Sequence, residues 1–244
     1  MTGLNAVSAR PITSGDTSGE TTWSPDGKIV FQKIMGQGEM NTWVMDADGS
    51  NPRQLTENAG RINAYPHVSP DGRYMLFVSE RTGTAHLWRM DINGTNPKQL
   101  TNNPNDYPWF GFDFTPDSKW IVYTRTGAGR GLWKVPIAGG EPTRLNTSPV
   151  AYYPAVSPDG MMLAYYHEDS SGQKGVEVMR LNGDNPARRF DIPMRTIRWM
   201  RNGRSLLYVK NEGDVSNLWN QPVSGEPPHQ ITHFNKLTHL QFDL

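Results

Sequence analysis

One short motif recurs along the chain at a nearly constant interval. It reads Trp-Ser-Pro-Asp-Gly or a variant of it, and its copies are Trp23–Gly27, Val68–Gly72, Phe114–Ser118, Val156–Gly160 and Trp199–Gly203. Successive copies begin 42 to 46 residues apart. A period of this length indicates a series of similar supersecondary units that stack on one another, rather than a fold built around one irregular core.

Two further landmarks keep the same phase. An aromatic residue is followed six positions later by glycine at Trp43, Trp88, Trp133 and Trp219, whereas Glu177 takes this place in the fourth copy. Each copy also ends on a segment such as Pro-Arg-Gln-Leu-Thr. The landmarks together divide the chain into five repeats, which we expect at residues 18–56, 62–101, 106–146, 151–191 and 195–232.

Each repeat has the pattern of four short strands. In the second copy these are 65–68, 74–79, 85–91 and 98–101, and they are separated by clusters of Gly, Asn and Asp. Apolar and aromatic runs of this length between turn residues are typical of β-strands. Four antiparallel strands in about 40–45 residues indicate a blade of a β-propeller, in which neighbouring blades cover each other's faces.

Composition excludes several other classes. The 24 glycines and 19 prolines would interrupt a helical bundle repeatedly, and the absence of cysteine excludes disulfides and cysteine zinc sites. Lys and Arg number 24 against 24 Asp and Glu, so we expect no nucleic-acid partner. No apolar run reaches the roughly 18 residues needed to cross a bilayer. We therefore expect no membrane insertion, and the first residues do not have the pattern of a signal peptide.

The two ends of the sequence match parts of a further repeat. Residues 9–13 resemble a fourth strand and residues 239–244 resemble a first strand. We favour a six-bladed parent whose last blade lacks its middle strands, and a five-bladed ring with two spare strands is the alternative. The chain is then expected to be a monomer unless the incomplete blade drives association.

The aspartates of the repeated motif are predicted to be structural. Proline presets φ at the first central position of a tight turn, aspartate accepts backbone N–H groups two residues on, and glycine accepts a positive φ. A preceding Ser or Thr hydroxyl can brace the same turn. A ring of acids for metal or catalysis is the competing interpretation, but a residue present in every repeat usually builds the repeat. The aspartates concerned are Asp26, Asp71, Asp117 and Asp159.

These motifs resemble the TolB-like β-propeller repeats. The resemblance rests on the Ser-Pro-Asp-Gly turns, the Trp of the third strand, the Asp-Gly-Ser-Asn-Pro-Arg-Gln-Leu-Thr type of ending and the period, from about Arg10 to Leu244. It implies a propeller and, by analogy with TolB, a protein partner bound at that propeller. Similar propellers form extracytoplasmic parts of bacterial kinases and regulators, so the resemblance favours a periplasmic or extracytoplasmic location.

The resemblance leaves two classes of function open. We favour a non-catalytic binding module for a protein or peptide. The alternative is an enzyme-associated propeller, either like the metal-dependent oligogalacturonate lyases or like the gating propeller of prolyl-oligopeptidase-like hydrolases. The chain has no G-x-S-x-G nucleophile motif, and its six histidines lack the spacing of a metal site. We therefore expect no catalytic residues, metal or cofactor, although histidines from different blades could still converge.

One candidate site is the central channel. The residue before each turn motif is variable and mostly polar, whereas the first residue of the motif is always large and apolar, so strand alternation predicts that the variable row faces the channel. Asp113 and Arg198 are either an internal ion pair or part of a pocket for an ion or small ligand. The predicted channel residues are His67, Asp113, Arg198 and Gln241.

The second candidate site is one rim of the propeller. The loops between strands two and three lie on the same side as the connections between repeats, and these segments vary most between copies. Aromatic and arginine side chains are common anchors of protein interfaces. The predicted partner-binding rim consists of Tyr107, Trp109, Phe110 and Arg130. The alternative is that these aromatic residues only pack between blades.

Overall fold

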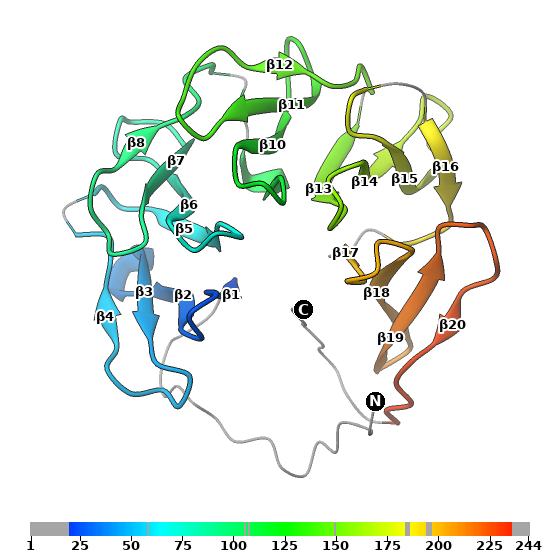
Figure 1. Cartoon of the computed structure of the whole chain (residues 1–244), viewed down its shortest axis with the longest axis horizontal. Coiled ribbons are helices and arrows are strands. Elements are labelled where there is room, and N and C mark those ends of the chain that lie inside the picture. The colour runs from blue at the N-terminus through cyan, green and yellow to red at the C-terminus, as the bar shows by residue number, and fades with distance from the viewer. Residues whose placement is uncertain are drawn as a thin grey trace. The chain divides into compact units, whose positions relative to one another are not determined.

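The computed structural model describes residues 20–57, 59–104, 106, 108–148, 150–183, 186–193 and 197–235 (Figure 1). The predicted partial blade of residues 9–13 and 239–244 lies outside the described residues, as do Tyr107 and Gln241. The chain divides into two compact units, residues 1–104 and 105–244.

The first unit contains two four-stranded antiparallel sheets, each with its strands in chain order. Blade 1 consists of β1 (Thr21–Trp23), β2 (Ile29–Ile34), β3 (Met40–Met45) and β4 (Arg53–Gln54). Blade 2 consists of β5 (Asn63–Val68), β6 (Tyr74–Ser79), β7 (His86–Asp91) and β8 (Lys98–Gln99).

The second unit contains three sheets with the same strand order (Figure 1). Blade 3 is β9 (Phe112–Phe114), β10 (Trp120–Arg125), β11 (Gly131–Pro136) and β12 (Thr143–Arg144). Blade 4 is β13 (Ala151–Val156), β14 (Met162–Glu168), β15 (Lys174–Arg180) and β16 (Pro186–Phe190). Blade 5 is β17 (Ile197–Trp199), β18 (Ser205–Glu212), β19 (Val215–Pro222) and β20 (His229–Gln230).

The prediction of an all-β chain of four-stranded antiparallel blades is confirmed. Among the described residues, helix is limited to two short 3₁₀ turns, η2 (Gly36–Gly38) and η3 (Pro108–Phe110). None of the helical segments in this part of the chain has the length and apolar character to span a membrane. Blade 4 differs from the rest in its outermost strand, β16, which has five residues where the other blades have two.

Within each unit, neighbouring blades bury their apolar faces against one another. In the first unit Val30 and Val44 of blade 1 pack with Phe77 and Met90 of blade 2. In the second unit, blades 3 and 4 share one cluster and blades 4 and 5 share another. Burying one large apolar side chain contributes about 1.5–3 kcal/mol, so this lateral packing is the main stabilising term for sheets that have no core of their own.

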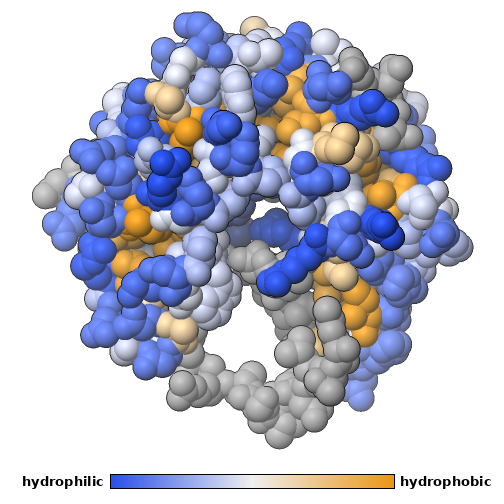
Figure 2. All heavy atoms as spheres, viewed as in Figure 1, coloured by the Kyte–Doolittle hydropathy of each residue, from blue (hydrophilic) through white to orange (hydrophobic). Residues whose placement is uncertain are grey.

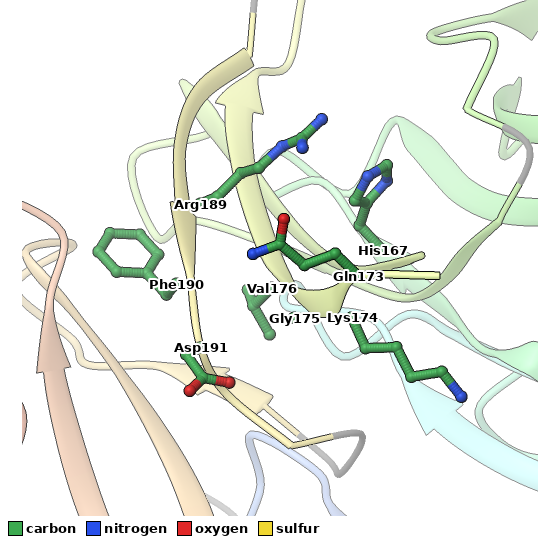
Figure 3. Close-up of a pocket in the computed structure, with 8 residues that line it drawn as sticks. All are labelled: His167, Gln173, Lys174, Gly175, Val176, Arg189, Phe190 and Asp191. Atoms are coloured by element: carbon green, nitrogen blue, oxygen red, sulfur yellow. The ribbon is translucent and has the colours of Figure 1, made fainter. Parts of the chain in front are cut away.

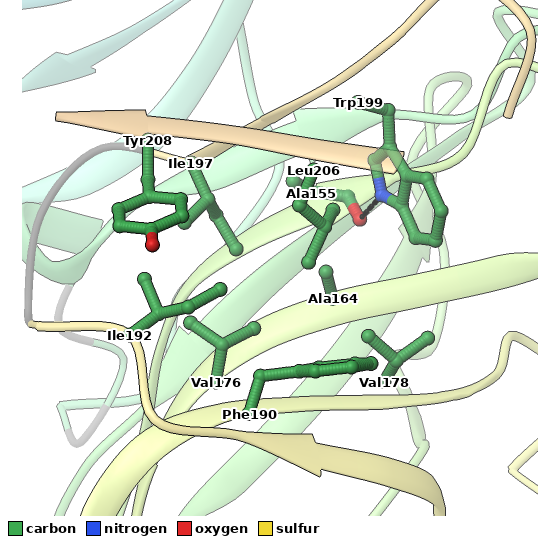
Figure 4. Packing of buried hydrophobic residues seen from close by; sticks show 10 residues of the cluster. All are labelled: Ala155, Ala164, Val176, Val178, Phe190, Ile192, Ile197, Trp199, Leu206 and Tyr208. Carbon is green, nitrogen blue, oxygen red and sulfur yellow. Dashed lines mark hydrogen bonds between the residues drawn. The ribbon is translucent and has the colours of Figure 1, made fainter. Parts of the chain in front are cut away.

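The cluster between blades 4 and 5 also contains a directional contact (Figure 4). The indole Nε1 of Trp199 donates a hydrogen bond of 2.8 Å to the carbonyl oxygen of Ala155. Trp199 is the first residue of its repeat motif, and the equivalent Phe114 and Val156 are also buried. Trp199 and Val156, which begin the motifs of blades 5 and 4, therefore face the preceding blade.

The inner strands do not alternate as simply as expected. The register of β5 against β6 shifts between Ala64 and His67, and that of β13 against β14 shifts between Tyr152 and Ala155. Tyr65 and Tyr153 take positive φ angles of 56° and 53° at these irregularities. A β-bulge inserts an extra residue and turns the preceding side chains to the other face. Simple alternation between two faces therefore does not continue through these irregularities, whereas the predicted row of residues next to each motif lies after them and stays a prediction.

Apolar side chains that remain exposed are few among the described residues. Hydrophilic residues cover most of the face drawn in Figure 2, and hydrophobic residues emerge in patches between them. The large hydrophobic residues with more than a third of their surface exposed are Trp23, Met35, Met161 and Ile231.

Candidate functional site

The aspartates of the repeated turns make the same contacts in successive blades. In blade 4 the Ser157 hydroxyl donates to Asp159 Oδ1 at 2.5 Å, and the backbone N–H of Met161 donates to the same oxygen at 2.9 Å. Asp71 and Asp117 accept equivalent bonds from their turns, and Asp26 accepts one from Ser24. These bonds lower the pKa of Asp159, chiefly through the Ser157 hydroxyl. The geometry shows how the aspartates close the turns.

The predicted rim is built at one end of blade 3. Asp106 forms an isolated antiparallel bridge with Arg125, the last residue of β10, and the turn η3 packs against β10. The loop that carries Arg130 leaves β10 at this same end. Trp109 is half-buried and Arg130 is exposed. The structure therefore brings these two predicted residues to one end of one blade, while Tyr107 and the side chain of Phe110 lie outside the described part of the chain.

A buried ion pair holds this end of blade 3. The guanidinium Nε of Arg125 lies 2.6 Å from Asp106 Oδ1, with side chains 9% and 1% exposed. Arg125 also donates to the Tyr123 hydroxyl at 3.0 Å and stacks on the indole of Trp133, 3.8 Å from the ring centre. The Trp133 indole N–H in turn donates to the carbonyl of Gly129. These contacts hold the loop that carries Arg130 against blade 3.

The predicted channel residues lie on inner strands of both units. His67 is on β5 in the first unit, and Asp113 on β9 and Arg198 on β17 are in the second. Both Asp113 oxygens accept backbone N–H groups, from Phe114 and from Val156, at 2.8 Å each. The hydrogen bond from Val156 connects blade 3 with blade 4, so Asp113 has a structural role. A ligand pocket at these residues stays a prediction.

Blade 4 departs from a pattern that the other blades share. In those blades the third-strand tryptophan carries a basic side chain over its ring, 3.8–4.8 Å from the ring centre. These pairs are Lys33 with Trp43, Arg81 with Trp88, Arg125 with Trp133, and Lys210 with Trp219. Glu177 stands at this position in β15, so blade 4 places a carboxylate where its neighbours place an indole.

Buried polar groups surround this carboxylate. Glu177 Oε1 accepts the Tyr165 hydroxyl at 2.8 Å, and Oε2 lies 3.2 Å from Arg189 Nε and 3.7 Å from His167 Nδ1. Tyr165, His167 and Glu177 are all less than a tenth exposed. Burial, and next the charge of Glu177, raise the pKa of the Tyr165 phenol. The phenol therefore stays protonated and donates to the carboxylate.

A cavity of about 110 Å³ opens beside this cluster (Figure 3). His167, Gly175, Arg189 and Asp191 line it together with residues of the loop before β15. No group of three or more His, Cys, Asp or Glu residues suited to a metal ion occurs in the described ranges. The cavity lies within blade 4, and Val176 and Phe190 line it beside the polar side chains.

Comparison with known proteins identifies the family. A family model described as the TolB beta propeller domain matches residues 8–193, which is most of the chain. The chain belongs to the TolB β-propeller family. No curated protein sequence matches it.

Solved structures agree with this TolB-family fold. TolB from Acinetobacter baumannii superposes with a TM-score of 0.71 at 23% identity, over 88% of this chain and 54% of the TolB chain. An oligogalacturonate lyase in complex with manganese has a TM-score of 0.64 at 18% identity, over 86% and 63% of the two chains. Puromycin hydrolase has a TM-score of 0.66 at 16% identity, over 92% and 40%.

The extent of these matches limits what they show. The chain spans about half the length of the Acinetobacter baumannii TolB chain. Because all three identities are below 25%, the superpositions show a shared fold. Both a TolB protein and enzymes are among the similar structures, so function has to be argued from the sites of this TolB-family chain.

The cavity in blade 4 was not among the sites predicted from the sequence. Its signal was present, because Glu177 replaces the aromatic residue that marks the other repeats. A residue that differs from its equivalents in the other repeats is not one that every blade needs in order to fold. The partners of Glu177 in this TolB-family blade, Arg189 and His167, come from the two strands on either side of it, and spacing along the sequence does not reveal that juxtaposition.

Proposed function

We propose that the chain is a non-catalytic binding module of the TolB β-propeller family that contacts a protein or peptide partner through the rim of blade 3. The observation that carries the proposal is the position of Trp109 and Arg130 at the same end of this blade. Membership of the TolB family supports it, although similar folds also include enzymes.

The physical argument concerns the cost of binding. Aromatic and arginine side chains give the largest losses when they are truncated in interfaces, because they desolvate a large surface and keep a polar group. Ordering a loop on binding costs affinity, and a loop that is already held avoids this cost. The loop of Arg130 is held by Trp133 through the Gly129 carbonyl and by Arg144, which donates to the carbonyl of Arg130.

A peptide library displayed on phage and selected on the chain tests the proposal. Selected peptides are expected to lose about 2 kcal/mol of binding free energy or more with Trp109→Ala. Arg130→Ala is expected to weaken them as well. Met161→Ala is the matched control, because Met161 is also exposed and lies in the turn of blade 4. Selected peptides that bind both rim variants as tightly as wild type would overturn the rim assignment.

The non-catalytic part of the proposal has its own test. The chain is incubated with oligogalacturonate and added manganese, since a similar fold carries that activity and that metal. We expect no unsaturated product in the ultraviolet absorbance. Product that forms in proportion to the concentration of the chain would contradict the proposal and favour an enzyme.

A further inference from the structure

The repeated motif turns of blades 1 to 3 match their basic side chains with acids. In each of these blades the residue two positions after the motif aspartate is basic, and it forms an ion pair with an acid of its own blade. The charges at this end of blades 1 to 3 are therefore partly balanced within each blade. The pairs are Lys28 with Asp46 at 2.7 Å, Arg73 with Asp71 at 2.7 Å, and Lys119 with Asp117 at 3.9 Å.

Blade 4 replaces an acid at this end by an arginine. Arg180 lies on β15 opposite Met162, at the position that Asp91 has on β7. The N–H of Leu181 donates to the carbonyl of Met161 at 2.9 Å. Arg180 therefore lies beside the motif turn of blade 4.

Blade 5 changes the motif itself. Its motif reads Trp-Met-Arg-Asn-Gly, so Asn202 stands where the other blades have aspartate and Arg201 stands where they have proline. Arg204 keeps the basic position of Arg73 and Lys119, but the motif carboxylate with which those two residues pair is absent. This turn therefore carries two basic side chains and no acidic one.

A series of contacts joins these turns to Arg188 of β16. A Cβ on Gly203 would lie 3.9 Å from Asp159 Oδ2, so the motif turns of blades 5 and 4 adjoin. The carbonyl of Arg204 accepts the N–H of Val223 at 3.0 Å, and the carbonyl of Val223 accepts a guanidinium N–H of Arg188 at 3.1 Å. We call this surface the basic patch, and it consists of Arg180, Arg188, Arg201 and Arg204.

The basic patch has few acids to neutralise it. All four arginines are exposed, and none forms an ion pair with a described residue. Asp159 Oδ1 already accepts hydrogen bonds from the hydroxyl and the backbone N–H of its own turn. Glu226 is exposed at the same end and pairs with no described residue, and Asp184 lies outside the described part of the chain. A cluster of exposed charges of one sign attracts ligands of the opposite sign.

We infer that the basic patch binds an acidic segment of a protein partner, with the carboxylates of its Asp or Glu residues on the arginines. The planar guanidinium presents N–H groups in a fork that matches a carboxylate, and such charge-assisted hydrogen bonds are stronger than neutral ones. A nucleic acid fits less well, because residues 157–162, 180–183, 200–205 and 222–226 include no aromatic side chain on which bases could stack.

This surface is distinct from the proposed rim. The basic patch lies where strands one and three end in blades 4 and 5, whereas the loop of Arg130 lies between strands two and three of blade 3. These are opposite ends of the strands, because all neighbouring strands of a blade are antiparallel. The inference therefore adds a second surface to the proposed binding module.

Fluorescence anisotropy with short labelled probes tests the inference. The probes are a peptide of alternating glutamate and serine, its glutamine and lysine counterparts, and an oligothymidylate of the same net charge. The glutamate peptide is expected to bind saturably, and to bind more weakly as NaCl rises from about 50 mM to about 200 mM, because salt screens exposed charges. The glutamine and lysine peptides are expected to bind at least about tenfold more weakly, and the oligonucleotide more weakly than the glutamate peptide.

Three results with these probes would overturn the inference. The first is a glutamate peptide that does not bind. The second is equal affinity for the glutamine peptide, which would mean that the surface does not recognise charge. The third is an oligonucleotide that binds as tightly as the glutamate peptide, which would favour a nucleic acid as the partner.

Charge reversals locate the binding on the basic patch. The double variant Arg201→Glu and Arg204→Glu is expected to weaken the glutamate peptide at least about tenfold, and Arg188→Glu about threefold, because attraction becomes repulsion. Arg53→Glu is the matched control, since Arg53 has the equivalent position on β4 and also donates to a backbone carbonyl. It is expected to leave the affinity unchanged. Equal losses in Arg53→Glu and Arg188→Glu would assign the binding to net charge and contradict the patch.

The rim and the basic patch can fail independently. Trp109→Ala is expected to leave the affinity for the glutamate peptide unchanged. In ¹⁵N spectra this peptide is expected to shift the amide signals of Gly203 and Gly225, which lie beside the arginines. Loss of the glutamate peptide in Trp109→Ala, without shifts at these two glycines, would place it at the rim and overturn the patch alone. Library peptides that ignore the rim variants would count against the rim alone.

Discussion

Blades 3 and 4 belong to one compact unit and share one strand order, yet they use the same repeat position for opposite purposes. Trp133 in blade 3 lies beneath Arg125 and completes a stack that anchors the rim loop. Glu177 in blade 4 replaces that indole with a carboxylate and gathers Tyr165, His167 and Arg189 around it. One substitution in the repeat turns a packing position into a polar cluster beside a cavity.

The difference shows what the repeat does and does not constrain. The turns and the faces between blades are similar in both blades, because every blade needs them to close its strands and cover its neighbour. The residue type at the third-strand position of Trp133 and Glu177 differs between the blades, since a basic residue over an aromatic ring is one of several ways to fill the space near the loop between strands two and three. A blade can therefore acquire functional residues at this position and keep its fold.

The largest effect is expected from the ion pair of blade 3. Asp106→Ala leaves the Arg125 guanidinium buried without its carboxylate, and breaking a buried pair in this way costs about 3–5 kcal/mol. The free energy of unfolding in urea measures the loss. Glu141→Ala, an exposed acid in the same blade, is the control and should stay within about 0.5 kcal/mol of wild type. A loss as small as that of the control would mean that the ion pair between Asp106 and Arg125 does not stabilise blade 3.

A second prediction compares the inner strands of the two blades. Gly111 in blade 3 has a φ of 91°, and a Cβ there would lie 2.9 Å from the Cα of Tyr153. Gly111→Ala therefore combines strain of about 1–2 kcal/mol with a backbone contact that has to move. We expect a loss of about 2 kcal/mol or more by the same measurement.

Gly213 supplies the control for this change. It also has a positive φ, 62°, but nothing lies within 4 Å of an added Cβ. Gly213→Ala should show the strain alone and cost less than Gly111→Ala. Equal losses would mean that the close approach between blades 3 and 4 carries no energy.

The third prediction concerns the carboxylate of blade 4. Glu177→Gln keeps the shape of the side chain but weakens its bonds to the Tyr165 hydroxyl and to Arg189. Hydrogen bonds to a charged group are worth about 1.5–3 kcal/mol, and the half-exposed Arg189 reduces this to about 1–2 kcal/mol. Glu212→Gln is the control, since Glu212 pairs with Lys210 at 2.7 Å on the surface. Thermal or urea unfolding of the two variants should differ clearly, and equal losses would make the blade 4 cluster no more than a surface pair.

The sequence predicts the blades well because three landmarks repeat in phase. The run of residues 74–79 is predicted as a strand and is β6 in the structure, since an apolar run between turn residues has few other solutions. Trp88 and Trp133 lie on third strands for the same reason.

The rest depends on contacts between strands and on local backbone geometry. The bulges at Tyr65 and Tyr153 require a positive φ at a bulky residue, which no propensity predicts. The cavity is lined by His167, Gly175 and Asp191, which come from three separate segments of the chain that lie together only in the folded blade. The repeated landmarks predict the features that all blades share. The replacement of the aromatic residue by Glu177 indicates in the sequence that blade 4 differs from them.

The smallest effect is expected at the turns, where blades 3 and 4 are alike. Hydroxyl hydrogen bonds from Thr115 and Ser157 are the main causes that lower the pKa of Asp117 and of Asp159 below the ordinary value of 3.8. A carboxyl whose pKa is lower in the folded chain stabilises it above the unfolded pKa, and this contribution is lost as the pH falls through the folded pKa.

Asp159→Ala should cost about 1 kcal/mol at neutral pH through the lost turn bonds. It should also make the free energy of unfolding fall less steeply between about pH 5 and about pH 3 than in wild type. Asp159→Asn copies Asn202, which accepts the backbone N–H of Arg204 at 2.9 Å in the same turn of blade 5, so it should cost less at neutral pH and flatten the pH dependence as much. If Asp159→Ala instead left stability unchanged and abolished peptide binding, the turn aspartates would be functional residues, and the likeness of blades 3 and 4 at their turns would need another cause.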